Sequence, residues 1–138
     1  MTTRSVIEKY MNHMFTGDFV AAFDMYAPDG QYIIIGDTPV SGTYTGPEHI
    51  KRDLMGLLAE RFIAPPVVSC TDIIVENDRG VALGFGEGSA KFGHYKQRNY
   101  AFAFTIDGDQ VTKMIEFMDP NQLSMNCFGQ TLSEPLPA

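Results

Sequence analysis

Apolar residues in the first part of the chain recur every three or four positions, which predicts amphipathic helices. One predicted helix spans residues 6–15 and a second residues 19–26. A third begins at Pro47 and ends before residues 65–66, which are both proline. Between the second and third helices, residues 31–36 have the aromatic and β-branched content of a strand. That strand follows a turn predicted at Pro28-Asp29-Gly30.

Further along, short turn sequences separate longer stretches rich in strand-forming residues. These stretches predict strands over residues 67–75, 81–92, 96–106 and 111–118. Asp119 has the form of a helix N-cap and Gly129 that of a C-cap, and the tail from residue 133 is expected to be poorly ordered. The pattern predicts one α+β domain over residues 1–138, with helices on one face of a strongly curved mixed or antiparallel sheet that encloses one cone-shaped pocket.

Size and charge narrow the possible partners. A chain of 138 residues can bury one core, and its net charge of -7 argues against nucleic acid as a partner. No apolar run approaches the roughly 20 residues that span a membrane, and the N-terminus lacks signal-peptide features, so a cytoplasmic protein is expected. Cys70 and Cys127 are expected to be reduced thiols. The spacing of the cysteines and histidines indicates no metal site, and no cofactor is expected.

Alternation along the strands predicts which side chains face the pocket. On the predicted inward faces the pocket is aromatic and methionine-rich, as is usual for small-molecule sites, so a hydrophobic small molecule is the expected ligand. The wall residues expected from the strands are Tyr32, Ile34, Val81, Leu83, Phe85, Tyr100, Phe102, Met114, Glu116 and Met118. The helices are expected to contribute Met14, Phe23, Leu54 and Leu58.

Glu116 is the principal candidate for chemistry. Between Met114 and Met118 on an inward strand face, its carboxyl would lie in a low dielectric, which raises its pKa towards the range useful for proton transfer. A strand shifted by one position would instead expose Glu116 towards Lys113 or Arg98.

The other candidates have both a chemical and a purely structural interpretation. Tyr10, Tyr32 and Tyr100 are either core aromatics or phenols that converge to stabilise an oxyanion. Asp37 either caps the turn after the first strand or reaches the pocket rim as a base. Asp119 is either an acid at the end of the last strand or the N-cap of the following helix.

Three stretches carry a resemblance that covers residue 4 to about residue 128. They read IEKYMNHMFTGDFVAAFDMYAPDG, GDTPVSGTYTGPEHI and NYAFAFTIDGDQVTKMIEFMD. The chain resembles the nuclear-transport-factor-2-like (NTF2-like) superfamily, and within it the SnoaL-like, ketosteroid-isomerase-related proteins. This resemblance implies the cone-shaped fold. It does not settle the function, because the superfamily includes isomerases, dehydratases, cyclases, epoxide hydrolases and proteins without catalysis.

The resemblance also implies roles for single residues. In steroid isomerases the oxyanion-binding tyrosine corresponds to Tyr10 and the general base to Ile34. The second oxyanion donor corresponds to Asn99 or Tyr100, and strand parity favours Tyr100. An unchanged steroid-isomerase mechanism is therefore not expected. In SnoaL-type cyclases the acidic residue at the end of the last strand corresponds to Asp119.

Limonene-type epoxide hydrolases are a weaker match. Their tyrosine corresponds to Tyr32, their asparagine to Ile34, their arginine to Arg79 and one aspartate to Val81, while their other aspartate corresponds to Glu116. Half of the groups that activate water in these enzymes are therefore missing.

The leading hypothesis is a cofactor-independent acid/base enzyme of isomerase, cyclase or dehydratase type, acting on a hydrophobic oxygenated small molecule such as a natural product or steroid-like compound. An epoxide hydrolase with an altered triad and a non-catalytic dimer that binds a hydrophobic ligand are the alternatives. Glycines at 84, 86 and 88 would let the sheet bend. The resemblance implies a homodimer through the outer sheet face, and neither nucleic acid nor a membrane is expected as partner.

Overall fold

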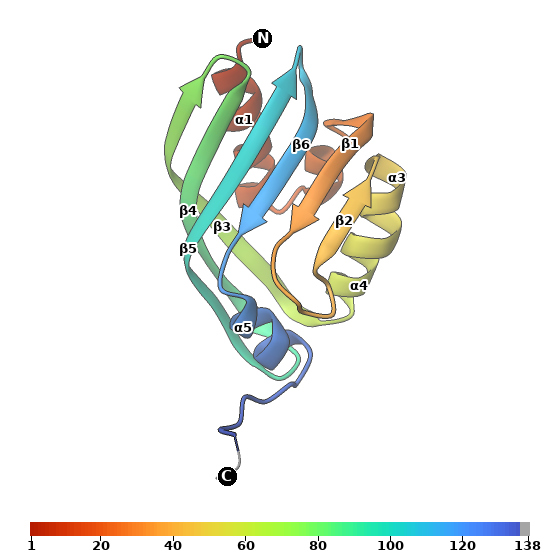
Figure 1. Cartoon of the computed structure of the whole chain (residues 1–138), viewed down its shortest axis with the longest axis vertical. Coiled ribbons are helices and arrows are strands. Elements are labelled where there is room, and N and C mark those ends of the chain that lie inside the picture. Colours follow the sequence, from red (N-terminus) through yellow and green to blue (C-terminus); the bar gives the residue numbers. More distant parts are fainter. Residues whose placement is uncertain (136–138) are drawn as a thin grey trace.

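The structure, a computed structural model, describes residues 1–135 (Figure 1). Helices come first and a long β-meander follows, as the sequence predicts. In chain order the elements are α1 (Thr3–Thr16), α2 (Phe19–Phe23), β1 (Tyr26–Ile34), β2 (Gly42–Thr45), α3 (Pro47–His49), a π-helix (Ile50–Met55), α4 (Gly56–Ala59), β3 (Phe62–Glu76), β4 (Arg79–Ala90), β5 (Gly93–Asp107), β6 (Gln110–Phe117), α5 (Pro120–Gln122) and a second π-helix (Leu123–Cys127). None of the helices within residues 1–135 has the length and apolar character needed to cross a membrane.

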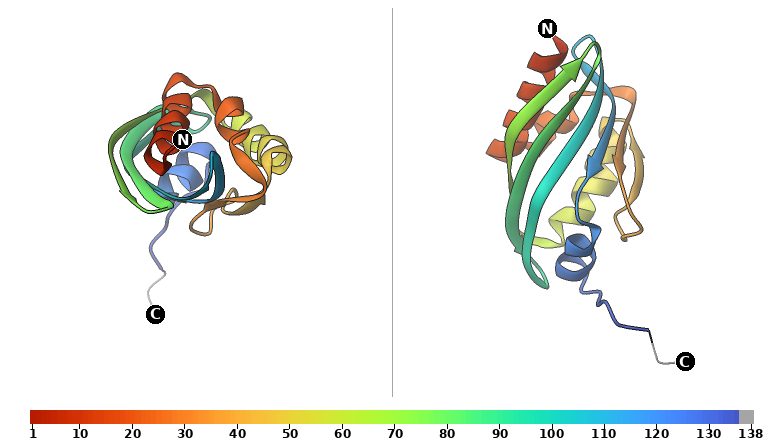
Figure 2. Two further views of the ribbon diagram at one scale, coloured as in Figure 1. Left: turned by 90° about the horizontal axis from the view of Figure 1, so that it is seen from above. Right: turned by 60° about the vertical axis from the view of Figure 1, so that its left-hand side comes forward.

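The strands form one six-stranded mixed sheet in the order β2-β1-β6-β5-β4-β3. Neighbouring strands are antiparallel except β1 and β6, which run parallel. The helices α1 to α4 lie on one face of the sheet, and α5 lies at one end (Figures 1 and 2). The sheet is twisted and open at both edges, so the expectation of a strongly curled sheet is not met.

Local capping fixes the first helix where the sequence predicts it. The Thr2 hydroxyl accepts a hydrogen bond from the Ser5 backbone N–H at 3.0 Å, and the Ser5 hydroxyl in turn accepts one from the Thr2 N–H at 2.9 Å. Gly17 ends the helix with a φ of 80°, a conformation that glycine adopts without strain. The apolar stripe of α1 is buried against the sheet.

Three features of the sheet differ from the sequence prediction. Residues 28–30 do not form a turn between elements but lie within β1, at a break in register between Tyr26 and Gln31. The short strand β2 was not predicted. β3 starts at Phe62 and includes residues 65–66, because it is the edge strand and prolines there remove no ladder hydrogen bond from a neighbour.

The β4 face prediction was wrong. Val81, Leu83 and Phe85 point to the outer face of the sheet, where Phe85 is 48% exposed. The inner face of β4 consists of Gly80, Ala82, Gly84 and Gly86, all buried. At Gly80 a small residue is needed because α1 packs on the strand, so that a Cβ would lie 2.5 Å from Cδ1 of Ile7. At Gly84 and Gly86 a Cβ would instead meet the β3 carbonyl oxygens of Ser69 and Val67, at 2.1 and 3.0 Å.

Across the middle of the sheet, register places one inward row directly beneath the helices. Ile34, Glu116, Phe102 and Ala82 come from four adjacent strands and pair in that order. Three of the four are apolar, and all four are buried. A carboxyl group therefore sits in the centre of the hydrophobic face that covers the core.

Candidate functional site

A cavity of about 340 Å³ lies between the inner sheet face and the helices. Its volume is at the small end of ligand pockets, which span about 300–1,000 Å³. Ala59, Ile63 and Pro65 are exposed and mark the mouth, where Ile63 is 76% exposed. The wall consists of Met14, Phe19, Phe23, Tyr32, Ile34, Val40, Met55, Leu58, Ala59, Phe62, Ile63, Pro65, Pro66, Val68, Tyr95, Tyr100, Glu116 and Leu123.

Glu116 is the one charged side chain on this wall within the described part of the chain. It comes from β6, faces inward as the alternation predicts, and is 9% exposed. Its Oε1 accepts a hydrogen bond from the Tyr32 hydroxyl at 2.7 Å. Among residues 1–135 the only fully buried polar side-chain atom without a partner is Nε of Arg61, so the unpaired Oε2 of Glu116 is open to the cavity.

The environment of Glu116 favours its protonated form. Burial raises the pKa of the carboxyl to about 7, against an ordinary value of 4.5, while the hydrogen bond from Tyr32 acts in the opposite direction. Near neutral pH the group can therefore both accept and donate a proton. This is the property that general acid/base catalysis requires.

Two further hydroxyls face the cavity from β5. The hydroxyl groups of Tyr95 and Tyr100 are hydrogen-bonded to each other at 2.7 Å, and both side chains are buried. Burial raises the pKa of each phenol, so both remain neutral hydrogen-bond donors. Since Phe102 pairs directly with Glu116, Tyr100 is the diagonal neighbour of Glu116 on the same face, about 7–8 Å away between backbones.

Tyr95 was not predicted because a bulge interrupts the alternation. Between the pairs Gly84–Tyr100 and Gly86–Gln97, β5 has one residue more than β4. Tyr95 and Tyr100, an odd number of residues apart, consequently face the same side. No simple period-two pattern in the sequence reveals this pair.

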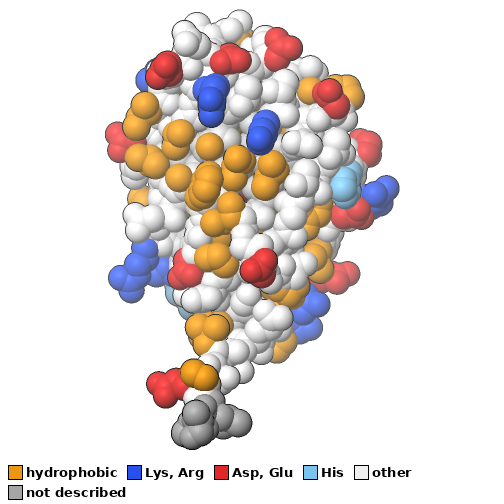
Figure 3. Space-filling model, in the orientation of Figure 1, with side chains coloured by type: hydrophobic (Ala, Val, Ile, Leu, Met, Phe, Trp, Pro, Cys, Tyr) orange, Lys and Arg blue, Asp and Glu red, His pale blue; other side chains and the backbone are white. Residues whose placement is uncertain are grey.

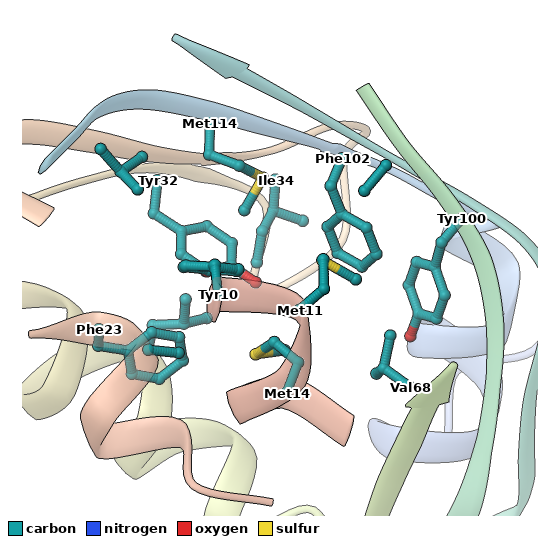
Figure 4. Close-up of a cluster of buried hydrophobic side chains, with 14 of the residues drawn as sticks. Tyr10, Met11, Met14, Phe23, Tyr32, Ile34, Val68, Tyr100, Phe102 and Met114 are labelled. Atoms are coloured by element: carbon teal, nitrogen blue, oxygen red, sulfur yellow. The ribbon is translucent and has the colours of Figure 1, made fainter. Parts of the chain in front are cut away.

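Tyr10, the tyrosine expected to bind an oxyanion, is not part of the cavity wall. Its hydroxyl is hydrogen-bonded to that of Tyr26 at 2.9 Å, and the side chain is fully buried in the core. Figure 4 shows Tyr10 within the packed cluster beside Tyr32. Its ring packs edge-on against Tyr26 and Phe104. Tyr10, which corresponds to the oxyanion-binding tyrosine of steroid isomerases, therefore makes a hydrogen bond within the core here and does not face the cavity.

The two candidate aspartates also lie outside the cavity. Asp119 is exposed and accepts a hydrogen bond from the backbone N–H of Asn121 at 3.0 Å, which makes it the N-cap of α5. Asp37 is exposed and does not line the cavity. The turn at Asp37 is instead stabilised by Ser41, whose hydroxyl accepts from Thr38 N–H and donates to the Ile35 carbonyl.

The predicted wall residues divide into three groups. Met14, Phe23, Tyr32, Ile34, Leu58, Tyr100 and Glu116 line the cavity. Leu54, Phe102, Met114 and Met118 are buried in the core but do not line the cavity; Figure 4 shows Phe102 and Met114 packed beside Ile34 and Met11. Val81, Leu83 and Phe85 are on the opposite face of the sheet, for the reason given above.

The arrangement expected for an epoxide hydrolase is not formed. Arg79 is exposed at the start of β4, and Val81 points to the outer face. Ile34 occupies the wall beside Glu116, at the position that corresponds to the asparagine of these enzymes. Residues 1–135 contain no cluster of three His, Cys, Asp or Glu side chains that could bind a metal.

Comparison with solved structures identifies the fold as NTF2-like, at low sequence identity. An NTF2-like protein from Burkholderia thailandensis is 16% identical, with a TM-score of 0.80 over 91% of this chain and 97% of that one. TerC, crystallised with polyporic acid, is 17% identical, with a TM-score of 0.76 over 91% and 98%. A protein of ketosteroid isomerase-like fold from Catenulispora acidiphila, in complex with trimethylamine, is 15% identical, with a TM-score of 0.71 over 89% and 92%. No protein-family model matches the chain, and no curated protein does.

Proposed function

We propose that this protein is a cofactor-independent acid/base enzyme that moves a proton on a small hydrophobic carbonyl compound. The observation that carries the proposal is a single carboxyl, Glu116, whose free oxygen faces an apolar cavity and whose pKa lies at about 7. Glu116 is the acid/base group. Tyr100, supported by Tyr95, is the hydrogen-bond donor to the carbonyl oxygen.

The reaction uses these groups in one cycle. Oε2 of ionised Glu116 accepts a proton from the carbon next to the carbonyl, and the electron pair of that C–H bond moves to the carbonyl oxygen. The Tyr100 hydroxyl donates a hydrogen bond to the resulting enolate, while Tyr95 donates to Tyr100. Glu116 then returns the proton to the same carbon or to a conjugated one. The second outcome is an isomerisation.

Tyr32 has a supporting role in this scheme. Its hydroxyl donates to Oε1, so it stabilises the ionised carboxyl and holds the other oxygen towards the cavity. Without it, burial would raise the pKa of Glu116 further and leave less of the base at neutral pH.

The cavity also restricts the substrate. A volume of about 340 Å³ with a wall of aromatic, methionine and aliphatic side chains fits a molecule of one or two rings with few polar groups. TerC, of the same fold, has been crystallised with polyporic acid, which is in keeping with a cyclic oxygenated ligand.

A non-catalytic protein that binds a hydrophobic ligand is the second candidate. It is favoured by the lack of a second charged side chain on the described wall, where the other titratable groups are neutral phenols. The two functions differ in one respect: only the enzyme exchanges protons between ligand and solvent.

Hydrogen–deuterium exchange into a panel of one- and two-ring ketones and enones, followed by mass spectrometry, tests the proposal. We expect wild type to label the carbon next to the carbonyl, and Glu116→Gln to slow this by about 10²–10⁴-fold. Glu87→Gln, which removes an exposed carboxyl of β4, is the control and should exchange as wild type. Equal exchange by wild type and Glu116→Gln would refute the assignment.

We also propose that the outer sheet face forms a homodimer. Figure 3 shows hydrophobic atoms gathered across the middle of this face. No helix of residues 1–135 covers an outward row that the register places across five strands. This row consists of Ile33, Ile115, Ala103, Val81 and Ile74. A two-fold interface brings the same patch of both copies together, so an uncharged row of this kind can pair with itself.

A further inference from the structure

The cavity has an unusual balance of charge for a site lined with aromatic rings. Its one charged side chain is an acid, Glu116, and no lysine, arginine or histidine of residues 1–135 lies on the wall. The six aromatic residues of the wall are Phe19, Phe23, Tyr32, Phe62, Tyr95 and Tyr100. Ring faces carry partial negative charge and attract cations.

No basic group reaches Glu116 from any element packed around it. β1 contributes the phenols Tyr32 and Tyr26, and α1 contributes Tyr10. β5 contributes the phenols Tyr95 and Tyr100. On the side of the helices α2 and α4 the wall is apolar. Ionised Glu116 therefore accepts a hydrogen bond from Tyr32, but no positively charged side chain of residues 1–135 lies beside it.

We propose that this cavity binds lipophilic amines in their protonated form, with the ammonium group hydrogen-bonded to Oε2 of Glu116 and its carbon substituents against the aromatic wall. The ammonium supplies the missing counter-charge through a charge-assisted hydrogen bond and gains cation–π attraction from the rings. The net charge of -7 also raises the local concentration of cations at the protein. Carboxylate ligands of the same shape are rejected by like charge.

This binding property goes beyond the proposed function, because it needs no proton transfer to the ligand and no turnover. It predicts a distinct dependence on pH. The amine requires ionised Glu116, whose pKa burial raises to about 7, so amine affinity rises as pH increases towards that value and then levels off. A neutral ligand of the same shape has no such requirement and shows little change over the same range.

The test uses three probes that share one ring: cyclohexylmethylamine, cyclohexylmethanol and cyclohexanecarboxylate. Their affinities are measured by isothermal titration calorimetry from about pH 5.5 to about pH 8.5, on either side of the raised pKa. At the upper end we expect the amine to bind at least about tenfold more tightly than the alcohol, and the carboxylate to bind most weakly. At the lower end this preference should disappear.

Two variants and one control show whether Glu116 is responsible. Glu116→Gln should bind amine and alcohol alike at every pH, whereas Glu116→Asp keeps the charge and should keep a pH-dependent preference. Glu87→Gln, an exposed carboxyl on β4, should behave as wild type. Circular dichroism of each variant verifies that the fold is retained.

Several results would overturn the inference: equal affinity for amine and alcohol at high pH, no amine binding there, or a preference that survives in Glu116→Gln. These results are separate from failure of the proposed function. If the protein exchanges protons into ketones but shows no preference for the amine, the proposed enzymatic function stands and the amine-binding inference fails. If the protein prefers the amine but exchanges protons into no carbonyl compound, the amine-binding inference stands and the proposed enzymatic function fails.

Discussion

Replacing Glu116 with glutamine should change how the stability of the protein depends on pH. The folded pKa of about 7 lies above the ordinary value of 4.5, so folding favours the protonated carboxyl. The favourable contribution is complete below pH 4.5 and is lost as pH rises towards about 7. At about 1.4 kcal/mol per pH unit, the difference between these values corresponds to about 3 kcal/mol of unfolding free energy.

The assay is urea denaturation of wild type and Glu116→Gln at a series of pH values, compared as the difference in unfolding free energy. Glutamine does not titrate and keeps a similar shape, so the difference curve isolates the carboxyl. We expect wild type to lose about 3 kcal/mol relative to the variant between pH 4.5 and about 7, and nothing more above that.

Glu87→Gln provides a control of opposite sign. The hydrogen bond from His94 lowers the pKa of the Glu87 carboxyl, so this group adds stability as pH rises through its titration. A flat difference curve for Glu116→Gln, or one that bends as for Glu87→Gln, would mean that Glu116 is hydrated or ion-paired. The acid/base assignment would then be refuted.

Four further substitutions have expected outcomes. Tyr100→Phe removes the proposed oxyanion donor and should lower kcat by about 10²-fold with little change in KM, measured by proton exchange into ketones. Gly84→Ala places a Cβ 2.1 Å from the Ser69 carbonyl oxygen and should cost about 1–3 kcal/mol in urea unfolding, whereas Gly56→Ala, with open space around it in a helix, should stabilise by about 0.5–1 kcal/mol. Ile115→Lys on the outer face should shift a dimer to a folded monomer in analytical ultracentrifugation, and an unchanged sedimentation coefficient would argue against that interface.

The inward face at the end of β6 could be predicted from the sequence because inward and outward residues alternate there without interruption. Met114, Glu116 and Met118 alternate with residues of the outer face, and all three are buried as predicted. Tyr32 and Ile34 on β1 follow the same rule. The principal candidate carboxyl and its phenol partner were therefore accessible to pattern reasoning.

β4 shows where this reasoning fails. Both of its faces are free of charge over Val81 to Gly86, so hydrophobicity does not distinguish inside from outside. The larger residues point outward because the inner face leaves little space: a Cβ would meet Ile7 of α1 at Gly80, and the β3 backbone at Gly84 and Gly86. Which face of a strand a helix covers depends on tertiary packing, and the sequence of the strand does not determine it.

The remaining differences have equally specific causes. A bulge in β5 brings Tyr95 beside Tyr100, and its position depends on pairing with β4. Tyr10 satisfies its hydroxyl with Tyr26, a residue that precedes the irregular part of β1. The hydroxyl pairs Tyr95–Tyr100 and Tyr10–Tyr26 both depend on the tertiary structure, so the sequence alone did not predict them.

The most direct measurement is the pKa of Glu116 in the free protein, by carbon-13 NMR titration of side-chain carboxyl groups with Glu116→Gln to identify its signal. We expect an apparent pKa of about 7, well above the ordinary value of 4.5. A value near 4.5 would contradict it, because the carboxyl would then be hydrated or ion-paired and not held in an apolar cavity.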